Sequence, residues 1–245
     1  MPEGPSIVIL REQAAPFAGR KVLRVAGNSK VLDLQRMRGQ RVMDVKSWGK
    51  HFLIAFPGFA IRVHFLLFGS YRINERKDTA PRLTLTFQRS ELNFYACSLQ
   101  YVEGELDQTY DWSGDVMSDL WNPRAARRKL KARPRMLVCD ALLDQTVFAG
   151  VGNIIKNEVL FRTRVHPEST VGELPTRKLG EVIKQAREYS FDFYKWKKAF
   201  VLRKHYLVHT KKLCPLCKIV LQFRASLGQS QRRSFFCDNC LRLYA

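Results

Sequence analysis

The sequence has no long hydrophobic run and few cysteines. No stretch approaches the ~18 consecutive apolar residues that a membrane-spanning helix needs, and the first ten residues lack the basic segment and the cleavage site of a secretory signal peptide. We therefore expect a cytoplasmic protein with no membrane partner. Only six cysteines occur in 245 residues, and Cys97 and Cys139 stand alone. A disulfide framework is therefore not expected.

Acidic residues are also scarce. The chain has 22 Asp and Glu against 42 Lys and Arg, a formal charge of +20 with a pI near 10.0, while its hydrophobic content of 46% is ordinary for a globular protein. A field this positive favours a polyanion as partner: nucleic acid first, then an anionic membrane surface, then acidic proteins. Residues 1–120 carry 16 basic and 13 acidic residues, whereas residues 121–245 carry 26 and 9. The second half therefore supplies most of the positive field.

The pattern of hydrophobic residues divides the chain. Before residue 120, segments such as RVMDVKSWGKHFLIAF and FAIRVHFLLF are rich in β-branched and aromatic residues with period-two stretches. They predict a mostly antiparallel β-domain, a sandwich or barrel, which a helix from about Pro5 to Phe17 opens. After the basic segment 111–136, helices are predicted for MLVCDALLDQ, NIIKNEVLFRTR and TRKLGEVIKQAREYSFDFYKWKK. The predicted fold class is α+β, with domains at 1–120, 121–207 and 208–245.

Four cysteines near the C-terminus have the spacing of a metal site. Two CxxC pairs, Cys214 with Cys217 and Cys237 with Cys240, lie nineteen residues apart and can hold one tetrahedral ion. Because four thiolates leave no position open for a catalytic water, we predict one structural Zn²⁺. A pair of redox dithiols, or chance spacing, is the alternative. The hairpin between the pairs carries Arg232, which suits phosphate contact, although arginines on a turn more often form a solvated surface pair.

Two further segments are candidate sites. The turn AGVGN puts Asn153, a favoured N-cap, at the start of a predicted helix whose N–H groups can bind phosphate; its glycines can equally serve only to turn the chain. At the N-terminus, removal of Met1 would expose the secondary amine of Pro2 beside the carboxylate of Glu3. Such an amine can attack an aldehyde-like sugar carbon and form an iminium, and a pKa of ~7.7–8 leaves it partly neutral near pH 7. The alternative is a rigid entry into the first helix.

These motifs occur together in one known family. The chain resembles the formamidopyrimidine-DNA glycosylase and endonuclease VIII family in Pro2-Glu3, in SWGKHFL around Lys50, in AGVGN, in the four-cysteine hairpin and in QRRSFFC. The resemblance keeps the family's order and spans nearly the whole chain. It implies an N-terminal β-sandwich domain, a helix-two-turn-helix domain and a C-terminal zinc-finger β-hairpin. It also implies a bacterial-type, nucleoid-associated DNA glycosylase and AP lyase of base excision repair, which binds damaged double-stranded DNA as a monomer.

The resemblance assigns chemical roles at the start of the chain. Pro2 would be the nucleophile that displaces the damaged base and forms a Schiff base with the sugar. Glu3 would be the acid and base, and Lys50 would join them in the catalytic set. Successive β- and δ-elimination would then cut the strand on both sides of the lost sugar.

The resemblance also implies how DNA is held. Phosphate contacts would come from Lys50, His64, Asn153 and Arg232. The apolar wedge that fills the gap left by the extruded base would be Leu66, Leu67 and Phe68. Outside this context, Lys50 is typical of a solvated strand end, His64 of a core histidine, and the wedge of an ordinary strand.

The segment before the zinc finger distinguishes the branches of the family. The formamidopyrimidine branch carries a long glycine-rich loop there, whereas residues 194–214 are compact and contain no glycine. The resemblance is therefore closest to endonuclease VIII, whose usual substrates are oxidised pyrimidines. Ser6 departs from the family, which usually has Glu at this position. Two alternatives stay open: a non-catalytic family member that binds damaged DNA, and a basic zinc-ribbon protein that binds RNA, which leaves Pro2-Glu3 and AGVGN unexplained.

Overall fold

The computed structural model describes residues 2–29 and 32–245. The chain forms two compact units, Met1–Asp111 and Trp112–Ala245. The division falls at the start of the segment 111–136, where the strand pattern of the sequence ends.

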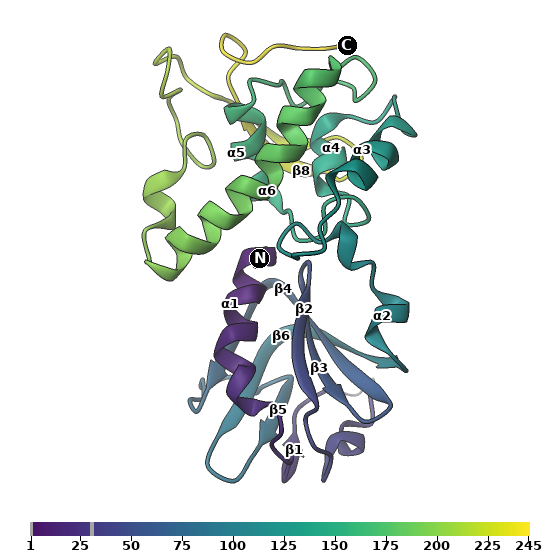
Figure 1. The fold of residues 1–245 in the computed structure, drawn as a ribbon. Coiled ribbons are helices and arrows are strands. Elements are labelled where there is room, and N and C mark those ends of the chain that lie inside the picture. Colours follow the sequence, from purple (N-terminus) through teal and green to yellow (C-terminus); the bar gives the residue numbers. More distant parts are fainter. Residues whose placement is uncertain (1, 30–31) are drawn as a thin grey trace. The chain divides into compact units, whose positions relative to one another are not determined.

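The first unit is built on one antiparallel sheet. Its helical segments are α1 (Gly4–Ala14), the 3-10 turns η1 (Ala15–Phe17) and η2 (Leu34–Met37), and α2 (Leu106–Thr109). Its strands are β1 (Arg24–Ala26), β2 (Asp44–Trp48), β3 (His51–Phe56), β4 (Phe59–Ile73), β5 (Leu83–Thr86) and β6 (Glu91–Glu103), in the order β1-β5-β6-β4-β3-β2. The helix forms where it was predicted, because Pro5 suits its first turn and Ile7, Leu10 and Ala14 are buried on one face. That face packs against β2 and β3 (Figure 1).

The long strands β4 and β6 let this sheet enclose its own core. Phe52 on β3 lies in the same row as Leu99 on β6, because both residues pair with Val63. Phe94 lies five residues before Leu99, which is ~17 Å along an extended strand. The rings of Phe52 and Phe94 are nevertheless 5.8 Å apart. The two halves of the sheet therefore fold over one hydrophobic core, as the predicted antiparallel sandwich requires.

The second unit holds the predicted helices and the predicted hairpin. Its elements are η3 (Trp112–Gly114), α3 (Pro123–Lys131), α4 (Val138–Leu143), α5 (Asn153–Arg162), α6 (Thr176–Lys198), η4 (Leu202–His205), β7 (Gln222–Leu227) and β8 (Arg232–Phe236). Asn122 caps α3, since its side chain accepts hydrogen bonds from the N–H groups of Arg124 and Ala125. An antiparallel sheet in the first unit and mainly helices in the second confirm the predicted α+β class.

Two buried charged residues of α5 join the C-terminal segment to the helices. Lys156, 1% exposed, donates hydrogen bonds from Nζ to Ser234 Oγ (2.7 Å) and to the carbonyl of Arg233 (3.0 Å). Glu158 is fully buried and accepts hydrogen bonds from the N–H groups of residues 207, 208 and 209. A buried charge is tolerated only with such partners. The polar face of α5 therefore makes the finger and the helices one packed unit.

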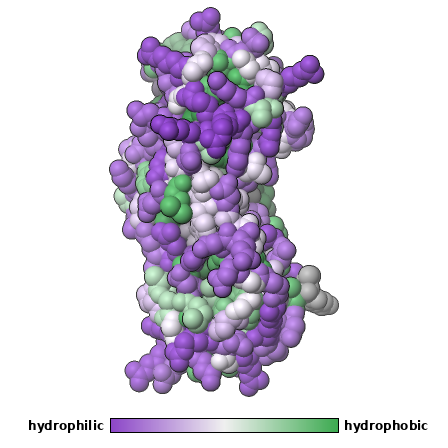
Figure 2. Space-filling model, turned by 45° about the vertical axis from the view of Figure 1, so that its right-hand side comes forward, coloured by the Kyte–Doolittle hydropathy of each residue, from purple (hydrophilic) through white to green (hydrophobic). Residues whose placement is uncertain are grey.

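The surface agrees with the hydropathy of the sequence. Within the described residues, no helix combines the length and the apolar character that crossing a membrane requires. On the face shown in Figure 2, hydrophilic residues predominate and hydrophobic residues form small separate patches.

Candidate active site and metal centre

Pro2 and Glu3 stand directly before the first helix. Glu3 is the N-cap residue of α1 and only 3% of its surface is exposed, while Pro2 is half-buried. The carbonyl of Glu3 accepts a hydrogen bond from the N–H of Ser6 (2.8 Å), which closes the first turn. A carboxylate at this end of a helix is favoured by the helix dipole. The arrangement places an acid or base one residue from the backbone nitrogen of Pro2; Met1 lies outside the described residues.

Lys50 lies at the tip of the β2–β3 hairpin, in a turn that Gly49 permits with its φ of +52°. The next residue, His51, pairs across the sheet with His64, and their rings meet edge to face at 5.4 Å. The ring of Tyr110 lies 5.8 Å from that of His51. The sheet thus brings Lys50 and His64 to the same region and adds a histidine and a tyrosine that sequence reasoning did not select.

Both histidines are held neutral. Burial, together with the smaller effects of Arg62, His64 and Lys50, lowers the pKa of His51 to about 3. Burial also lowers the pKa of His64, with Lys50 and Arg62 adding to the effect. At neutral pH the imidazole of His64 is therefore mainly a neutral hydrogen-bond donor, and the positive charge of this region comes from Lys50 and Arg62.

The three predicted wedge residues lie on an extruded segment of β4. The pairing of β4 with β6 breaks between Phe65 and Ser70, where only Ala96 stands between the partners Cys97 and Tyr95. The intervening side chains are exposed: Leu66 by 50%, Leu67 by 56% and Phe68 by 84%. In an ordinary strand of this sheet some of these side chains would be buried in the core, and here none of them is. Apolar side chains held this way on a bulge are available to contact a ligand.

Asn153 occupies the first turn of α5, but not the predicted position. The N-cap is Gly152, whose backbone is extended, and Asn153 is the first residue of the helix without a capping hydrogen bond. The N-cap prediction was wrong because the preceding turn is fixed instead by Gln145, which accepts a hydrogen bond from the N–H of Gly150 (3.1 Å) and donates to the carbonyl of Val151 (3.1 Å). The buried Oδ1 of Asn153 has no hydrogen-bond partner among the described residues. Such an atom is suited to a water or ligand.

Arg232 is exposed at the start of β8, and a carboxylate outside the finger holds the turn before it. Asp140, in the first turn of α4, accepts hydrogen bonds from the N–H groups of Gln229 (2.8 Å) and Ser230 (2.9 Å). Gly228 has a φ of +69°, and a Cβ there would lie 2.3 Å from Oδ2 of Asp140. The close approach of the carboxylate therefore requires glycine at this position.

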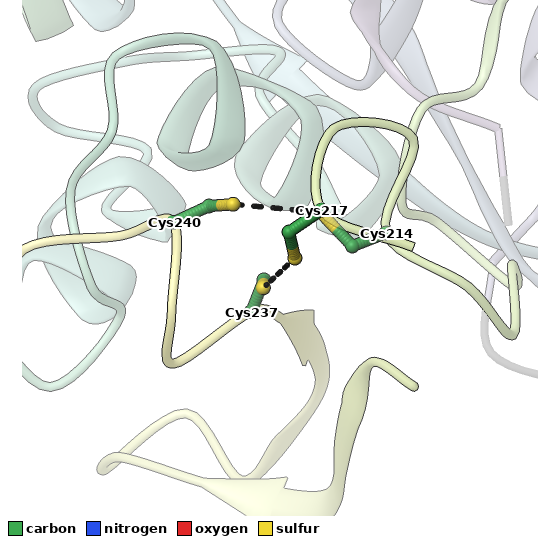
Figure 3. Close-up of side chains that lie close together, drawn as sticks. All are labelled: Cys214, Cys217, Cys237 and Cys240. Carbon is green, nitrogen blue, oxygen red and sulfur yellow. Dashed lines mark hydrogen bonds between the residues drawn. The ribbon is translucent and has the colours of Figure 1, made fainter. Parts of the chain in front are cut away.

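The four predicted metal ligands converge (Figure 3). Their sulfur atoms all lie within 4.8 Å of one another, with 3.7 Å between Cys214 and Cys240 and 3.5 Å between Cys217 and Cys237. A Zn–S distance of ~2.3 Å in a tetrahedral site requires sulfur atoms roughly 3.8 Å apart. A hydrogen bond from the backbone at Ile219 lowers the pKa of the Cys217 thiol to about 6, which favours the metal-binding thiolate. The residues therefore fit one tetrahedral metal ion.

Sequence reasoning missed the residues that support these side chains. His51 stands beside Lys50 and was visible only as part of SWGKHFL; Arg62 and Tyr110 had no signal that linked them to it. Asp140 had none either, since the turn that it holds lies about ninety residues further along the chain. Tyr110 and Asp140 lie far in sequence from the residues that they contact.

Comparison with known proteins identifies the class to which this fold and these residues belong. Two family models match: the formamidopyrimidine-DNA glycosylase N-terminal domain at residues 1–98 and the formamidopyrimidine-DNA glycosylase H2TH domain at residues 114–189. Endonuclease 8-like 3 of Xenopus laevis is 33% identical over 242 residues, which cover 93% of this chain and 39% of that protein. The DNA-(apurinic or apyrimidinic site) lyase Nei2 of Mycolicibacterium smegmatis is 31% identical over 159 residues, 62% of each chain. The chain belongs to the formamidopyrimidine-DNA glycosylase and endonuclease VIII family.

Solved structures agree on the fold. A formamidopyrimidine-DNA glycosylase of Lactococcus lactis, crystallised non-covalently bound to DNA with an AP site, has a TM-score of 0.85 at 19% identity and covers 98% of this chain and 99% of its own. The chain spans about two fifths of the length of the Endonuclease 8-like 3 relatives that it matches.

Proposed function

We propose that the protein is a bifunctional DNA glycosylase and AP lyase of base excision repair. The observation that carries the proposal is the N-terminus, where a buried carboxylate, Glu3, directly follows Pro2 at the entry to α1. With Met1 removed, the secondary amine of Pro2 attacks C1′ of the damaged nucleotide. The C1′–N bond to the base breaks and the base leaves with a proton. The C1′–O4′ bond then breaks, O4′ takes up a proton as the sugar ring opens, and an iminium joins Pro2 to C1′. Glu3 is the group placed to deliver and accept protons.

Strand cleavage follows from the same iminium. Loss of a proton from C2′ expels the 3′ phosphate by β-elimination, and a second elimination expels the 5′ phosphate. The sugar is thereby removed, and the two new ends of the strand, one on each side of the gap, both carry phosphates. Water finally hydrolyses the adduct and returns the free amine of Pro2.

The remaining site residues would hold the DNA. Lys50, Asn153 and Arg232 would contact phosphates, and His64 would do so as a neutral donor. Leu66, Leu67 and Phe68 would enter the stack where the nucleotide is extruded, and their exposure on the bulge supports this role. The four cysteines would bind one Zn²⁺, which crosslinks the base of the β7–β8 hairpin and leaves no coordination position for chemistry.

The proposed substrates are oxidised pyrimidines in duplex DNA. The support is the short connection between α6 and the first cysteine, which has no glycine and contains η4 rather than a long loop. The relatives named Endonuclease 8-like agree with this branch of the family. Ser6, in the first turn of α1, stands where the family usually has Glu, and this difference would alter which oxidised base is preferred.

One incubation tests the enzyme. The protein is mixed with end-labelled duplexes that carry an oxidised pyrimidine, an oxidised purine or an abasic site, with and without borohydride. Trapping of a covalent adduct is expected, with the oxidised pyrimidine cut more readily than the purine and phosphates at both new ends. The control variant has Pro2→Gly and one additional residue before position 2, so that no free amine remains at this position. If this variant is still trapped, Pro2 is excluded as the nucleophile.

A non-catalytic member that binds damaged DNA is the second candidate. The exposed bulge favours it as much as it favours the enzyme, because a wedge can recognise distorted DNA without cutting it. This candidate predicts tight binding of an abasic duplex with no cleavage and no trapping. A zinc-ribbon protein for RNA would instead bind RNA without preference for damaged DNA.

A further inference from the structure

Phe200 has no structural reason to be a phenylalanine. The residue directly follows the end of α6, where the N–H of Val201 bonds to the carbonyl of Trp196 (2.9 Å) and the N–H of Phe200 to that of Lys197 (3.1 Å). This pattern is a Schellman motif, whose left-handed position is usually glycine. Phe200 holds that position with a φ of +59°, which is unfavourable for a bulky side chain.

Packing does not compensate for this conformation. The side chain of Phe200 is 96% exposed, the highest value among the large hydrophobic residues that the structure describes. A residue that is strained in its backbone and buries almost nothing stabilises neither the helix end nor the core. Sites that break a local rule in this way are where function is expected.

The turn that carries Phe200 is rigid. The indole of Trp196 stacks on the imidazole of His205 with centroids 4.0 Å apart and planes 3° from parallel. Trp196 also contacts the ring of Tyr189 edge to face, with centroids 5.8 Å apart, and Tyr189 is fully buried. The carbonyl of His205 accepts a hydrogen bond from Arg162 of α5 (3.2 Å). Phe200 is therefore presented from a fixed backbone and would lose little entropy on contact with a ligand.

The surroundings of Phe200 are strongly basic. Between Phe193 and Cys237 the chain has no Asp or Glu and eleven Lys and Arg. The exposed cations next to the turn are Lys195, Lys197, Lys198, Arg203 and Lys204. This charge selects a polyanion, and an exposed ring among cations is the arrangement that binds a base by stacking and the neighbouring phosphates by charge.

We propose that the end of α6, from Lys195 to Lys204, binds single-stranded DNA, with Phe200 as the platform on which one unpaired base stacks. Duplex DNA offers its phosphates to such a surface but keeps its bases paired, so the ring would discriminate between the two forms. The proposal extends the proposed function, because it adds unpaired DNA to the duplex as a partner, and it rests on the family's DNA binding but not on catalysis by Pro2.

The test compares two substitutions of Phe200. Phe200→Gly removes the ring and relieves the left-handed strain, so it should raise the melting temperature of this unit by about 2–4 °C. It should weaken binding of a labelled oligothymidylate by about 5-fold to 100-fold, the range for loss of one stacked base, and change the affinity for an undamaged duplex less than about twofold. Phe200→Trp should keep the affinity, and its added fluorescence should be quenched by the oligonucleotide.

Controls separate this surface from general effects. Leu120→Ala removes another exposed hydrophobic side chain of the same unit, 67% exposed, and should leave oligothymidylate binding unchanged. The inference is overturned if Phe200→Gly binds the oligonucleotide like the wild type, if it loses duplex binding equally, or if the RNA of the same sequence depends more strongly on Phe200 than the DNA does. Borohydride trapping by the wild-type protein reports the proposed function separately: its absence would overturn catalysis without affecting a Phe200-dependent binding of single strands.

Discussion

The position of Arg232 should depend on Asp140, a carboxylate that lies outside the zinc finger. Each oxygen of Asp140 accepts one N–H of the turn that leads to Arg232, at 2.8 and 2.9 Å. In Asp140→Asn one oxygen is replaced by an NH₂ group, which faces a donor and cannot accept from it. A hydrogen bond to a charged group contributes about 1.5–3 kcal/mol. The turn loses this stabilisation, and its backbone no longer holds Arg232 in one position.

The salt dependence of the affinity for DNA would reveal the loss of the Arg232 contact. The assay measures the Kd for a duplex with a tetrahydrofuran abasic analogue over a series of salt concentrations. Arg232→Ala should weaken binding and lower the slope of log Kd against log salt by about 0.9, the value for one phosphate contact. Asp140→Asn should lower the slope by most of this amount. The double variant should lose no more affinity than Arg232→Ala alone, because Asp140 acts only through the phosphate contact of Arg232.

The reasoning is refuted if Asp140→Asn binds DNA more tightly than the wild type. Removal of a negative charge from a DNA-binding unit predicts that result when the carboxylate positions nothing. Glu173→Gln, which removes an exposed carboxylate of the same unit, shows the size of this general effect. Gly228→Ala is a second test, since its Cβ would lie 2.3 Å from Oδ2 of Asp140 and displace the carboxylate without removing its charge. Both turn variants should keep one metal ion per chain.

Three further outcomes are expected. Glu3→Gln should slow base removal by about 100-fold or more, the contribution of a general acid or base, and leave the Kd for the abasic duplex within threefold; equal loss of both would assign Glu3 a structural role. Above pH 6.5 His51 is neutral in both the folded and the unfolded chain, and below it only the unfolded chain takes up a proton until the native pKa of about 3 is reached. The urea midpoint should therefore fall as the pH drops from 6.5 towards 3, less steeply in His51→Gln, and an unchanged slope would exclude His51 as the cause. Removal of the metal by a chelator, or Cys217→Ser, should lower the melting temperature of the second unit, because the metal holds the cluster around Cys214.

Features with a local cause could be predicted from the sequence. The first helix follows from Pro5 and from apolar residues at helical spacing, and the metal site follows from two CxxC pairs whose turns place the sulfurs within 4.8 Å. The prediction that Asn153 lies at the start of α5 is confirmed, but its prediction as the N-cap was wrong, because the N-cap is Gly152 with its extended backbone.

Features that depend on distant partners could not be predicted. The apolar run in HFLLFG gives by itself no sign that the pairing of β4 breaks at Phe65 and that Leu66, Leu67 and Phe68 leave the sheet. Lys156 and Glu158 look like ordinary polar residues of a helix, since the segments that bury them lie about fifty to eighty residues away. The left-handed backbone of Phe200 arises where α6 ends, which the sequence shows only as a basic, aromatic run.

The scarcity of acidic residues also has a structural meaning. Residues 121–245 have 26 basic and 9 acidic residues, a net charge of +17. Two of the nine, Asp140 and Glu158, are buried and face backbone N–H groups of the finger and of the segment before it. Others form ion pairs on α6, where Glu181 pairs with Lys178 and Glu188 with Lys184. Because these carboxylates act locally, the remaining cations are not cancelled at the surface. Asp140 thus holds the turn before Arg232, and the positive field that remains is available to the DNA phosphates of the proposed function.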